Sequence, residues 1–481
     1  MQRFGIFISI SLLILQSSCK ENNTSTQVQL TPYQKPNIVF VLADDMGIGD
    51  LGSYGQQYIQ TPNLDRMAEQ GMLFADFYSG STVCAPSRAS LMTGLHTGHV
   101  TVRGNGEFPL KATDTTITQI LKSQGYHTAM FGKWGLGLEG TTGSPEKKGW
   151  DEFTGHLHHV DAHFQHPDSL WSIVQGEVQK HAIESDAYAN DIFNQKGIEF
   201  IHKQSSDQPF FLLMSYTVPH AELRVADEFL EPYLDQQGHS VFTPEKAWPD
   251  GRHYGGQKYP KAAYAAMVSS VDAYIGSIME ALKEKGLEEH TLVIFTSDNG
   301  THIEGGRTKQ DVAFFNSNGN LRGVKRDLYE GGLRTPFIAY WPGTIAKGST
   351  SSVTAAFWDI LPTLADLAGY QGTLATDGIS IANTLLAKPQ EFNHEFLYWE
   401  FHEEGGKIAI RMGDWKVVWT HLLNEKTPIK CEVFNLKTDP SESVDLASQH
   451  PDIIEKAKAI YNQQHQKAEI KKFEISIPEA K

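Results

Sequence analysis

The segment PNIVFVLADD, residues 36–45, is an unbroken apolar run that ends in two acids, Asp44 and Asp45. A short run of this kind predicts a strand buried on both faces, as in a parallel sheet. Ligands of open α/β sheets bind outside the carboxyl ends of the strands. We therefore expect Asp44 and Asp45 to lie at the edge of the sheet where a functional site would form.

Further apolar runs repeat this pattern along the chain and alternate with helical periodicity. Strands are predicted at residues 127–131, 209–216, 290–296 and 335–340, and helices at residues 63–70, 116–124 and 262–285. Alternating strands and helices indicate an α/β fold with a large, mostly parallel sheet between layers of helices.

The pattern changes after about residue 385. A β-hairpin is predicted by two apolar runs, residues 407–412 and 415–419, on either side of the turn Gly413-Asp414. A short strand follows at residues 432–434, and residues 451–472 have the pattern of a polar amphipathic helix. We expect a catalytic domain over residues 36–385 and a smaller antiparallel α+β subdomain over residues 386–481.

The N-terminus has the features of an export signal. A basic start, an apolar run over residues 5–15 and small residues before Cys19 resemble a bacterial lipoprotein signal, although Gln16 stands where an aliphatic residue is usual. We expect a signal peptide over residues 1–18, lipidation of Cys19 and a tether over residues 19–35, with plain secretion as the alternative. The protein is then located in the periplasm or is an outer-membrane lipoprotein.

The net charge and the cysteine content limit the possible partners and the possible fates of the thiols. The 481 residues carry a net charge of −16, which disfavours nucleic acid as a partner. Beyond Cys19 the chain has two cysteines, Cys84 and Cys431, which an exported protein could pair. The residues around Cys84 indicate a different fate for that thiol.

The segment STVCAPSRASLMTG, residues 81–94, resembles the Cys-x-Pro-Ser-Arg signature of the formylglycine-dependent sulfatases, which belong to the alkaline-phosphatase-like superfamily. The resemblance extends over nearly the whole mature chain and includes residues 296–300, 321–332 and 434–440. It implies that a maturation enzyme oxidises Cys84 to the aldehyde formylglycine (3-oxoalanine). One hydroxyl of the hydrated aldehyde attacks sulfur, and the other releases the sulfate by re-forming the carbonyl.

The same resemblance implies a calcium site and a set of sulfate-binding cations. Asp44, Asp45, Asp298 and Asn299, with the modified Cys84, match the metal ligands, and hard oxygen donors suit Ca²⁺. Arg88, Lys133 and Lys325 match the sulfate-binding residues, with Arg326 as an alternative register for Lys325. His220 matches the histidine that protonates the leaving oxygen.

One position departs from the family pattern. Many members read Gly-Lys-Trp-His-Leu-Gly, but this chain reads GKWGLG over residues 132–137, so Gly135 replaces a histidine that contacts the aldehyde hydrate. We predict that His163 supplies the missing imidazole, with His158 and His159 as alternatives. A surface loop rich in histidine is the competing interpretation.

Arg103, Asn105, His302 and Arg322 are candidate substrate contacts, although each could equally form structural hydrogen bonds. The sequence thus predicts an exported sulfuric ester hydrolase that removes sulfate from a carbohydrate, acting at a terminal, galactose-type sugar. The alternatives are a phosphate or phosphonate monoester hydrolase of the same superfamily and a non-catalytic glycan-binding lipoprotein.

Overall fold

A computed structural model describes Met1 and residues 35–478, except residues 252, 391 and 425. The predicted signal peptide, the tether up to residue 34 and Cys19 lie outside the described residues. From Lys35 onward the chain forms one compact unit. Whether residues 386–481 are a separate domain stays a prediction. Within the described part, no helix combines the length and the apolar character that crossing a bilayer requires.

The main sheet has ten strands, in the order β11-β2-β10-β9-β1-β8-β4-β5-β6-β7. Its centre is parallel, as predicted, and consists of β9 (Thr291–Ser297), β1 (Asn37–Asp44), β8 (Phe210–Pro219), β4 (His127–Lys133) and β5 (Glu152–His156). Antiparallel pairing begins on either side of this centre. On one side β10 (Phe337–Tyr340) is antiparallel to β9 and to β2 (Met72–Phe74), and β11 (Ser349–Ser351) then pairs with β2 in parallel. On the other side β6 (Ser169–Val174) is antiparallel to β5 and to β7 (Glu177–Ala182).

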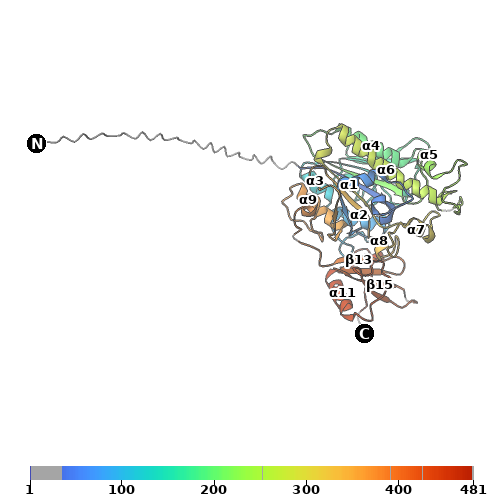
Figure 1. Cartoon of the computed structure of the whole chain (residues 1–481), viewed down its shortest axis with the longest axis vertical. Coiled ribbons are helices and arrows are strands. Elements are labelled where there is room, and N and C mark those ends of the chain that lie inside the picture. Colours follow the sequence, from blue (N-terminus) through green and yellow to red (C-terminus); the bar gives the residue numbers. More distant parts are fainter. Residues whose placement is uncertain (2–34, 252, 391, 425, 479–481) are drawn as a thin grey trace. The chain divides into compact units, whose positions relative to one another are not determined.

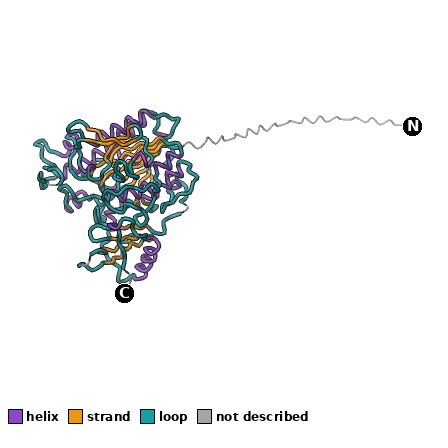
Figure 2. The backbone as a smooth tube through the Cα atoms, turned by 180° about the vertical axis from the view of Figure 1, so that it is seen from behind, coloured by secondary structure: helices purple, strands orange, loops and turns teal. Residues whose placement is uncertain are grey.

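Helices cover both faces of this sheet (Figures 1 and 2). One apolar core lies under α1 (Pro62–Gln70), α4 (Ala189–Lys203) and α6 (Pro260–Glu284). The core on the opposite face lies under α2 (Cys84–Thr93), α3 (Ile117–Ser123) and α9 (Ile360–Leu367). The shorter elements are β3 (Phe77–Tyr78), α5 (Asp227–Leu230), α7 (Lys309–Phe315), α8 (Glu330–Leu333), β12 (Ala355–Ala356) and α10 (Ala382–Leu385). The predicted α/β architecture is confirmed.

A second, antiparallel sheet closes the chain, as the hairpin pattern predicted. It contains β13 (Leu397–Phe401), β14 (Lys407–Met412), β15 (Trp415–Thr420) and β16 (Lys430–Asn435), and α11 (Pro451–Gln464) packs on it. The prediction of a helix up to residue 472 was wrong. The helix ends at Gln464 because His465 turns away to pair with Glu400, and Arg103 binds the next carbonyl, that of Gln466.

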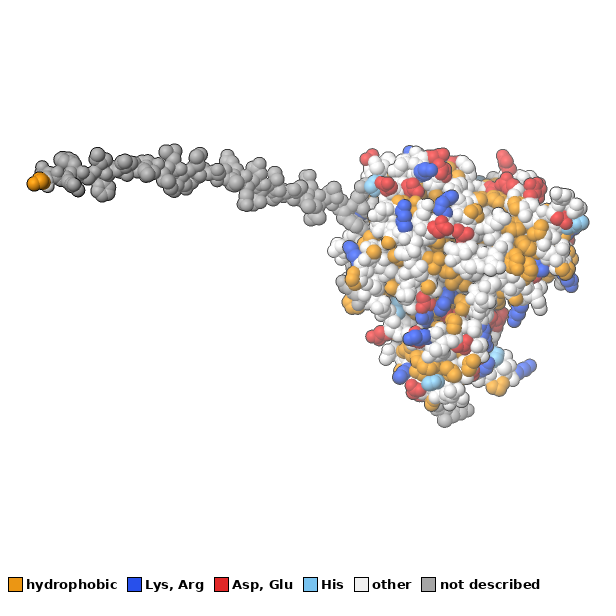
Figure 3. All heavy atoms as spheres, in the orientation of Figure 1, with side chains coloured by type: hydrophobic (Ala, Val, Ile, Leu, Met, Phe, Trp, Pro, Cys, Tyr) orange, Lys and Arg blue, Asp and Glu red, His pale blue; other side chains and the backbone are white. Residues whose placement is uncertain are grey.

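On the face of the molecule in Figure 3, acidic and basic side chains are interspersed.

Candidate functional site

The site forms where four neighbouring strands of the parallel sheet end. Asp44 closes β1, Lys133 closes β4, His220 follows β8, and Asp298 and Asn299 follow β9. Parallel strands present their carboxyl ends at one edge, so residues far apart in sequence meet there. All of these side chains are fully buried.

Helix α2 points its first residue at this edge. Cys84 Sγ lies 3.3 Å from Asp44 Oδ1, and Arg88, one turn further along, places its Nε 3.0 Å from Asp298 Oδ2. Residues four apart share a helix face, so α2 brings a sulfur and a guanidinium to the same place. Burial and the neighbouring Asp44 raise the pKa of the Cys84 thiol well above its usual value. An unmodified thiol here would be a poor nucleophile, because the thiolate is the reactive form.

The acidic residues crowd together in a way that suits a cation. Asn299 Nδ2 donates to Asp45 Oδ1 at 2.7 Å, and the Asp45 backbone amide donates to Asp298 Oδ1 at 3.1 Å. Asn299 Oδ1 is buried and has no hydrogen-bond partner among the described residues. Burial and the charge of Asp44 raise the pKa of Asp298 to about 7. Buried polar oxygens are normally satisfied, so an amide oxygen left without a partner beside three adjoining carboxylates fits a hard, oxygen-binding ion such as Ca²⁺.

Two buried lysines neutralise the aspartates from opposite sides. Lys133 Nζ lies 2.6 Å from Asp44 Oδ2, and Lys325 Nζ lies 2.8 Å from Asp45 Oδ2. Burial alone would raise the pKa of Asp44, but Lys133, followed by His220 and Arg88, holds it well below its usual value. Arg326, the alternative register for Lys325, turns instead toward Glu304 and Glu403. The structure therefore brings Lys325, not Arg326, to the aspartates.

The ring of His220 lies between Lys325 and the backbone carbonyl of the next residue, Ala221. Its Nδ1 contacts the carbonyl oxygen of Ala221, and its Nε2 lies 2.9 Å from Lys325 Nζ. With Nδ1 donating to that carbonyl, Nε2 accepts from the lysine. Burial, then Lys325, lowers the pKa of His220, so a neutral imidazole faces the site.

The histidine-rich segment reaches the same place. The ring of His163 stacks on that of His220, with 4.0 Å between ring centroids, and the buried His163 Nδ1 has no hydrogen-bond partner among the described residues. His159 lies beside Gly135: a Cβ at Gly135 would meet only Cβ of His159, at 3.6 Å. His158 and His159 both face Glu107. Gly135 itself has φ of +74°, which a side chain would strain.

The four candidate substrate contacts lie in different places. Asn105 Oδ1 accepts from the Ala85 amide at 3.1 Å, next to Cys84, and His302 Nε2 contacts the Pro219 carbonyl below His220. Arg103 is buried and donates to Glu400 and to three carbonyl groups. Arg322 stacks on Tyr329 and pairs with Glu432. The structure brings Asn105 and His302 to the site and engages both arginines elsewhere.

Sequence reasoning missed Glu304. Its carboxylate pairs with Lys325 at 3.4 Å, contacts Arg326 and lies 3.6 Å from His220. It stands in a loop five residues after Asn299 with no motif around it, so only the fold reveals it. Cys84 and Cys431 are both free, so the disulfide that the cysteine count allowed does not form.

Comparison with known proteins identifies the family. The model of the sulfatase domain matches residues 36–370. The chain belongs to the sulfatase family. A second family model, the C-terminal region of N-sulphoglucosamine sulphohydrolase, matches residues 324–469 of this sulfatase. The protein is therefore an enzyme, a sulfuric ester hydrolase, and the binding-protein alternative is disfavoured.

Individual relatives cover most of this sulfatase. N-acetylgalactosamine-6-sulfatase of Rattus norvegicus is 30% identical and aligns with 90% of this chain and 86% of its own length. N-acetylgalactosamine-6-O-sulfatase of Bacteroides thetaiotaomicron is 29% identical over 88% of this chain and 91% of its own. The crystal structure of Ps i-CgsB in complex with k-i-k-neocarrahexaose has 25% identity and a TM-score of 0.71, and the match covers 90% of this chain and 94% of the other.

Proposed function

We propose that this sulfatase removes a sulfate ester from a terminal, galactose-type sugar of a sulfated glycan. The observation that carries the proposal is the convergence of Cys84, three cations and four oxygen-bearing side chains at the ends of β1, β4, β8 and β9. The names of the relatives support a galactose-type sugar, because two are N-acetylgalactosamine-6-sulfatases and a third binds neocarrahexaose.

Cys84, once converted to formylglycine, is the proposed source of the nucleophilic hydroxyl. Asp44, Asp45, Asp298 and Asn299 would hold Ca²⁺, whose charge lowers the pKa of a bound hydroxyl and polarises the sulfate. The carboxylates of Asp44 and Asp45 next to Cys84 and the Asn299 Oδ1, which has no partner among the described residues, support this choice of ion.

The remaining residues have proposed roles in charge and proton handling. Arg88, Lys133 and Lys325 offset the charge that develops on the sulfate oxygens. His220 relays a proton to the leaving oxygen: its Nε2, 2.9 Å from Lys325 Nζ, takes a proton from that ammonium and hands it to the oxygen. His163 takes the place of the histidine missing at Gly135, since its ring stacks on His220 and its buried Nδ1 has no partner among the described residues. Asn105 and His302 are the proposed substrate contacts, while Arg103 and Arg322 position the surrounding loops.

We further propose that the chain is exported, is anchored by a lipid on Cys19 and depends on a formylglycine-generating enzyme. A phosphate or phosphonate monoester hydrolase remains the second candidate. Phosphonate monoester hydrolase of Agrobacterium radiobacter shares the fold, with a TM-score of 0.64 at 21% identity. Family membership favours sulfate.

The deciding experiment is the mass of the tryptic peptide that contains Cys84, in protein from its native host. We expect a loss of about 18 Da, as conversion of a thiol to the aldehyde nucleophile requires, together with release of inorganic sulfate from a sulfated galactose-type sugar. An unmodified thiol in folded, active protein would refute the proposed nucleophile. Faster release of phosphate than of sulfate would favour the second candidate.

A further inference from the structure

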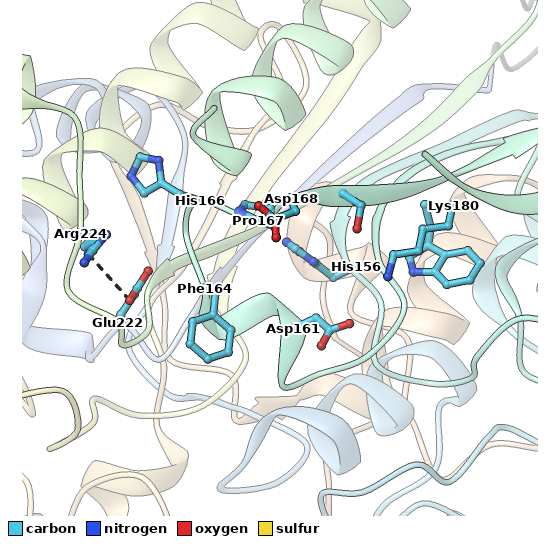
Figure 4. Close-up of a pocket in the computed structure, with 11 residues that line it drawn as sticks. His156, Asp161, Phe164, His166, Pro167, Asp168, Lys180, Glu222 and Arg224 are labelled. Carbon is cyan, nitrogen blue, oxygen red and sulfur yellow. Dashed lines mark ion pairs between the residues drawn. The ribbon is translucent and has the colours of Figure 1, made fainter. Parts of the chain in front are cut away.

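A separate pocket of about 450 Å³ lies beside the site, against the β6–β7 hairpin (Figure 4). Its walls come from the end of β5, the 3₁₀ turn Asp161–His163, the start of β6, β7 and the segment after β8. A volume of this size is within the range of small-molecule pockets.

The pocket and the catalytic centre share the same structural segments. His156, which lines the pocket, pairs in register with Lys133, and Asp161 and Glu222 are each two residues from a histidine of the site, His163 and His220. The Glu222 amide donates to the His163 carbonyl at 2.8 Å, which ties these two segments together. Two residues span at most about 7 Å, so the wall of the pocket directly adjoins the segments that carry the catalytic histidines.

The inner wall carries a polar atom that the protein leaves unsatisfied. His156 is 3% exposed, and its Nε2 has no hydrogen-bond partner among the described residues. Burial, then the charge of Lys133, lowers the pKa of His156 to about 3, so the ring is neutral. A buried nitrogen without a partner costs free energy unless a water or a ligand hydroxyl binds it.

The outer walls offer charges that no described residue neutralises. Asp161 and Asp168 are exposed acids that form no ion pair with any described residue, and Lys180 is an exposed cation whose Nζ lies 5.9 Å from the ring centroid of Trp171. In Figure 4 the side chains of Lys180 and Asp161 both lie near His156. Carboxylates accept hydrogen bonds from hydroxyl groups, a lysine binds an anionic substituent, and the half-buried Trp171 supplies an apolar face.

We propose that this pocket binds a second saccharide unit of the glycan, with hydroxyl groups toward His156, Asp161 and Asp168 and an anionic substituent at Lys180. The inference rests on the proposed function and extends it: the preferred substrate is an oligosaccharide, not a lone sulfated sugar. Because the inner wall is a neutral imidazole and the cation is at the rim, hydroxyl groups go inside and the charged group outside.

The test compares an aryl sulfate, a sulfated monosaccharide and sulfated tetrasaccharides, of which only the last are long enough to occupy the pocket. We would measure kcat and KM for 4-nitrophenyl sulfate, for 6-sulfated N-acetylgalactosamine, and for tetrasaccharides from a panel of sulfated galactose-type glycans. The parent enzyme is expected to have a KM at least about tenfold lower for its best tetrasaccharide than for the monosaccharide, as one or two charged hydrogen bonds would give. Equal KM values for the two would overturn the proposal.

The variant that isolates the pocket is Asp168→Asn with Lys180→Ala, since both side chains are exposed and neither belongs to the catalytic centre. We expect the tetrasaccharide advantage to disappear while kcat/KM for 4-nitrophenyl sulfate stays unchanged. Lys347→Ala, an exposed lysine outside the pocket, is the matched control and should change neither. The proposed pocket would be contradicted if the double variant kept the full tetrasaccharide advantage. It would also be contradicted if activity on tetrasaccharides and on 4-nitrophenyl sulfate fell equally.

A binding measurement separates this inference from the proposed function. Calorimetric titration with the same intact tetrasaccharides needs no turnover when the parent and the double variant both carry Cys84→Ala, and it keeps the anionic substituent proposed at Lys180. Binding that the double variant loses supports the pocket even if no sulfate is released. Absence of binding to every tetrasaccharide refutes the pocket and leaves the sulfatase activity untouched. An enzyme that releases no sulfate from any substrate refutes the proposed function instead.

Discussion

Two buried charge clusters in this sulfatase have the same formal composition and different arrangements. The strand-end cluster contains Asp44, Asp45, Asp298, Arg88, Lys133 and Lys325. The sheet-contact cluster, which joins α8 to the second sheet, contains Asp76, Glu330, Glu442, Arg334, Arg411 and Lys416.

In the sheet-contact cluster, acids and bases alternate. Glu330 contacts Arg334 at 2.7 Å and Lys416 at 2.8 Å, and these cations outweigh its burial and lower its pKa to about 2. In the strand-end cluster, three carboxylates adjoin one another, and the Asn299 amide oxygen has no partner among the described residues. The Cys84 sulfur lies 3.3 Å from Asp44. Alternating acids and bases indicate a structural contact, whereas carboxylates that adjoin one another next to a nucleophile position indicate a ligand site.

The largest effect should come from Cys84→Ala. Removing the nucleophile of a covalent mechanism is expected to lower kcat by about 10⁴-fold or more, with little change in thermal unfolding because one small buried side chain replaces another. Sulfate release and melting temperature would be measured together. Retention of a tenth of the parent rate would mean that Cys84 is not the nucleophile.

Removal of the metal should have the next largest effect. Chelation followed by desalting is expected to lower kcat by on the order of 100-fold, and Ca²⁺ should restore it and raise the melting temperature, because an ion that binds only the folded state stabilises it. Asp298→Asn should weaken this response. Full activity after complete chelation, checked by elemental analysis, would rule out the calcium site.

His163→Ala tests the substitute for the histidine absent at Gly135. We expect kcat to fall by about 100-fold, the usual contribution of a general acid or base, with an altered pH–rate profile. His159→Ala is the matched control, since that ring lies beside Gly135 but faces Glu107. Unchanged turnover in His163→Ala, with a loss in His159→Ala, would transfer the role to His159.

Lys416→Met should affect stability and spare catalysis. It leaves Glu330 and Glu442 buried without a shared cation, and breaking such a contact costs about 3 kcal/mol of unfolding free energy. Denaturant unfolding would measure the loss, with Lys437→Met, on the exposed surface, as the control. A large fall in kcat with unchanged stability would show that the two clusters do not differ as described.

The smallest expected effect concerns pH. Burial raises the pKa of Glu442 to about 7, despite Lys416. The folded state then holds an extra proton between about pH 4.5 and 7, so this residue lowers stability as pH rises through that window. Glu442→Gln should flatten the dependence by about 1 to 3 kcal/mol, relative to the exposed control Glu455→Gln. An unchanged slope would mean that Glu442 is ionised throughout.

Local sequence patterns determined much of the fold of this protein and the position of its site. Unbroken apolar runs define β1, β8 and β9 because a strand covered on both faces cannot tolerate polar residues, and the polar residues after them therefore mark the edge where ligands bind. The motif around Cys84 resembles that of a known family, and the hairpin at Gly413 follows from turn chemistry. The end of α11 was not predictable, because it depends on contacts of Arg103 and His465 with distant groups.

Only the tertiary structure distinguished the roles of residues of the same chemical type. It placed Lys325 at Asp45 and turned the adjacent Arg326 to Glu304, and it directed Arg103 and Arg322 into structural contacts. It also brought Glu304 to the site, stacked His163 on His220 and left Nε2 of His156, in a second pocket, without a hydrogen-bond partner among the described residues. Sequence specifies which side chains are present and on which element, whereas partners across the sheet depend on how elements far apart in the chain pack.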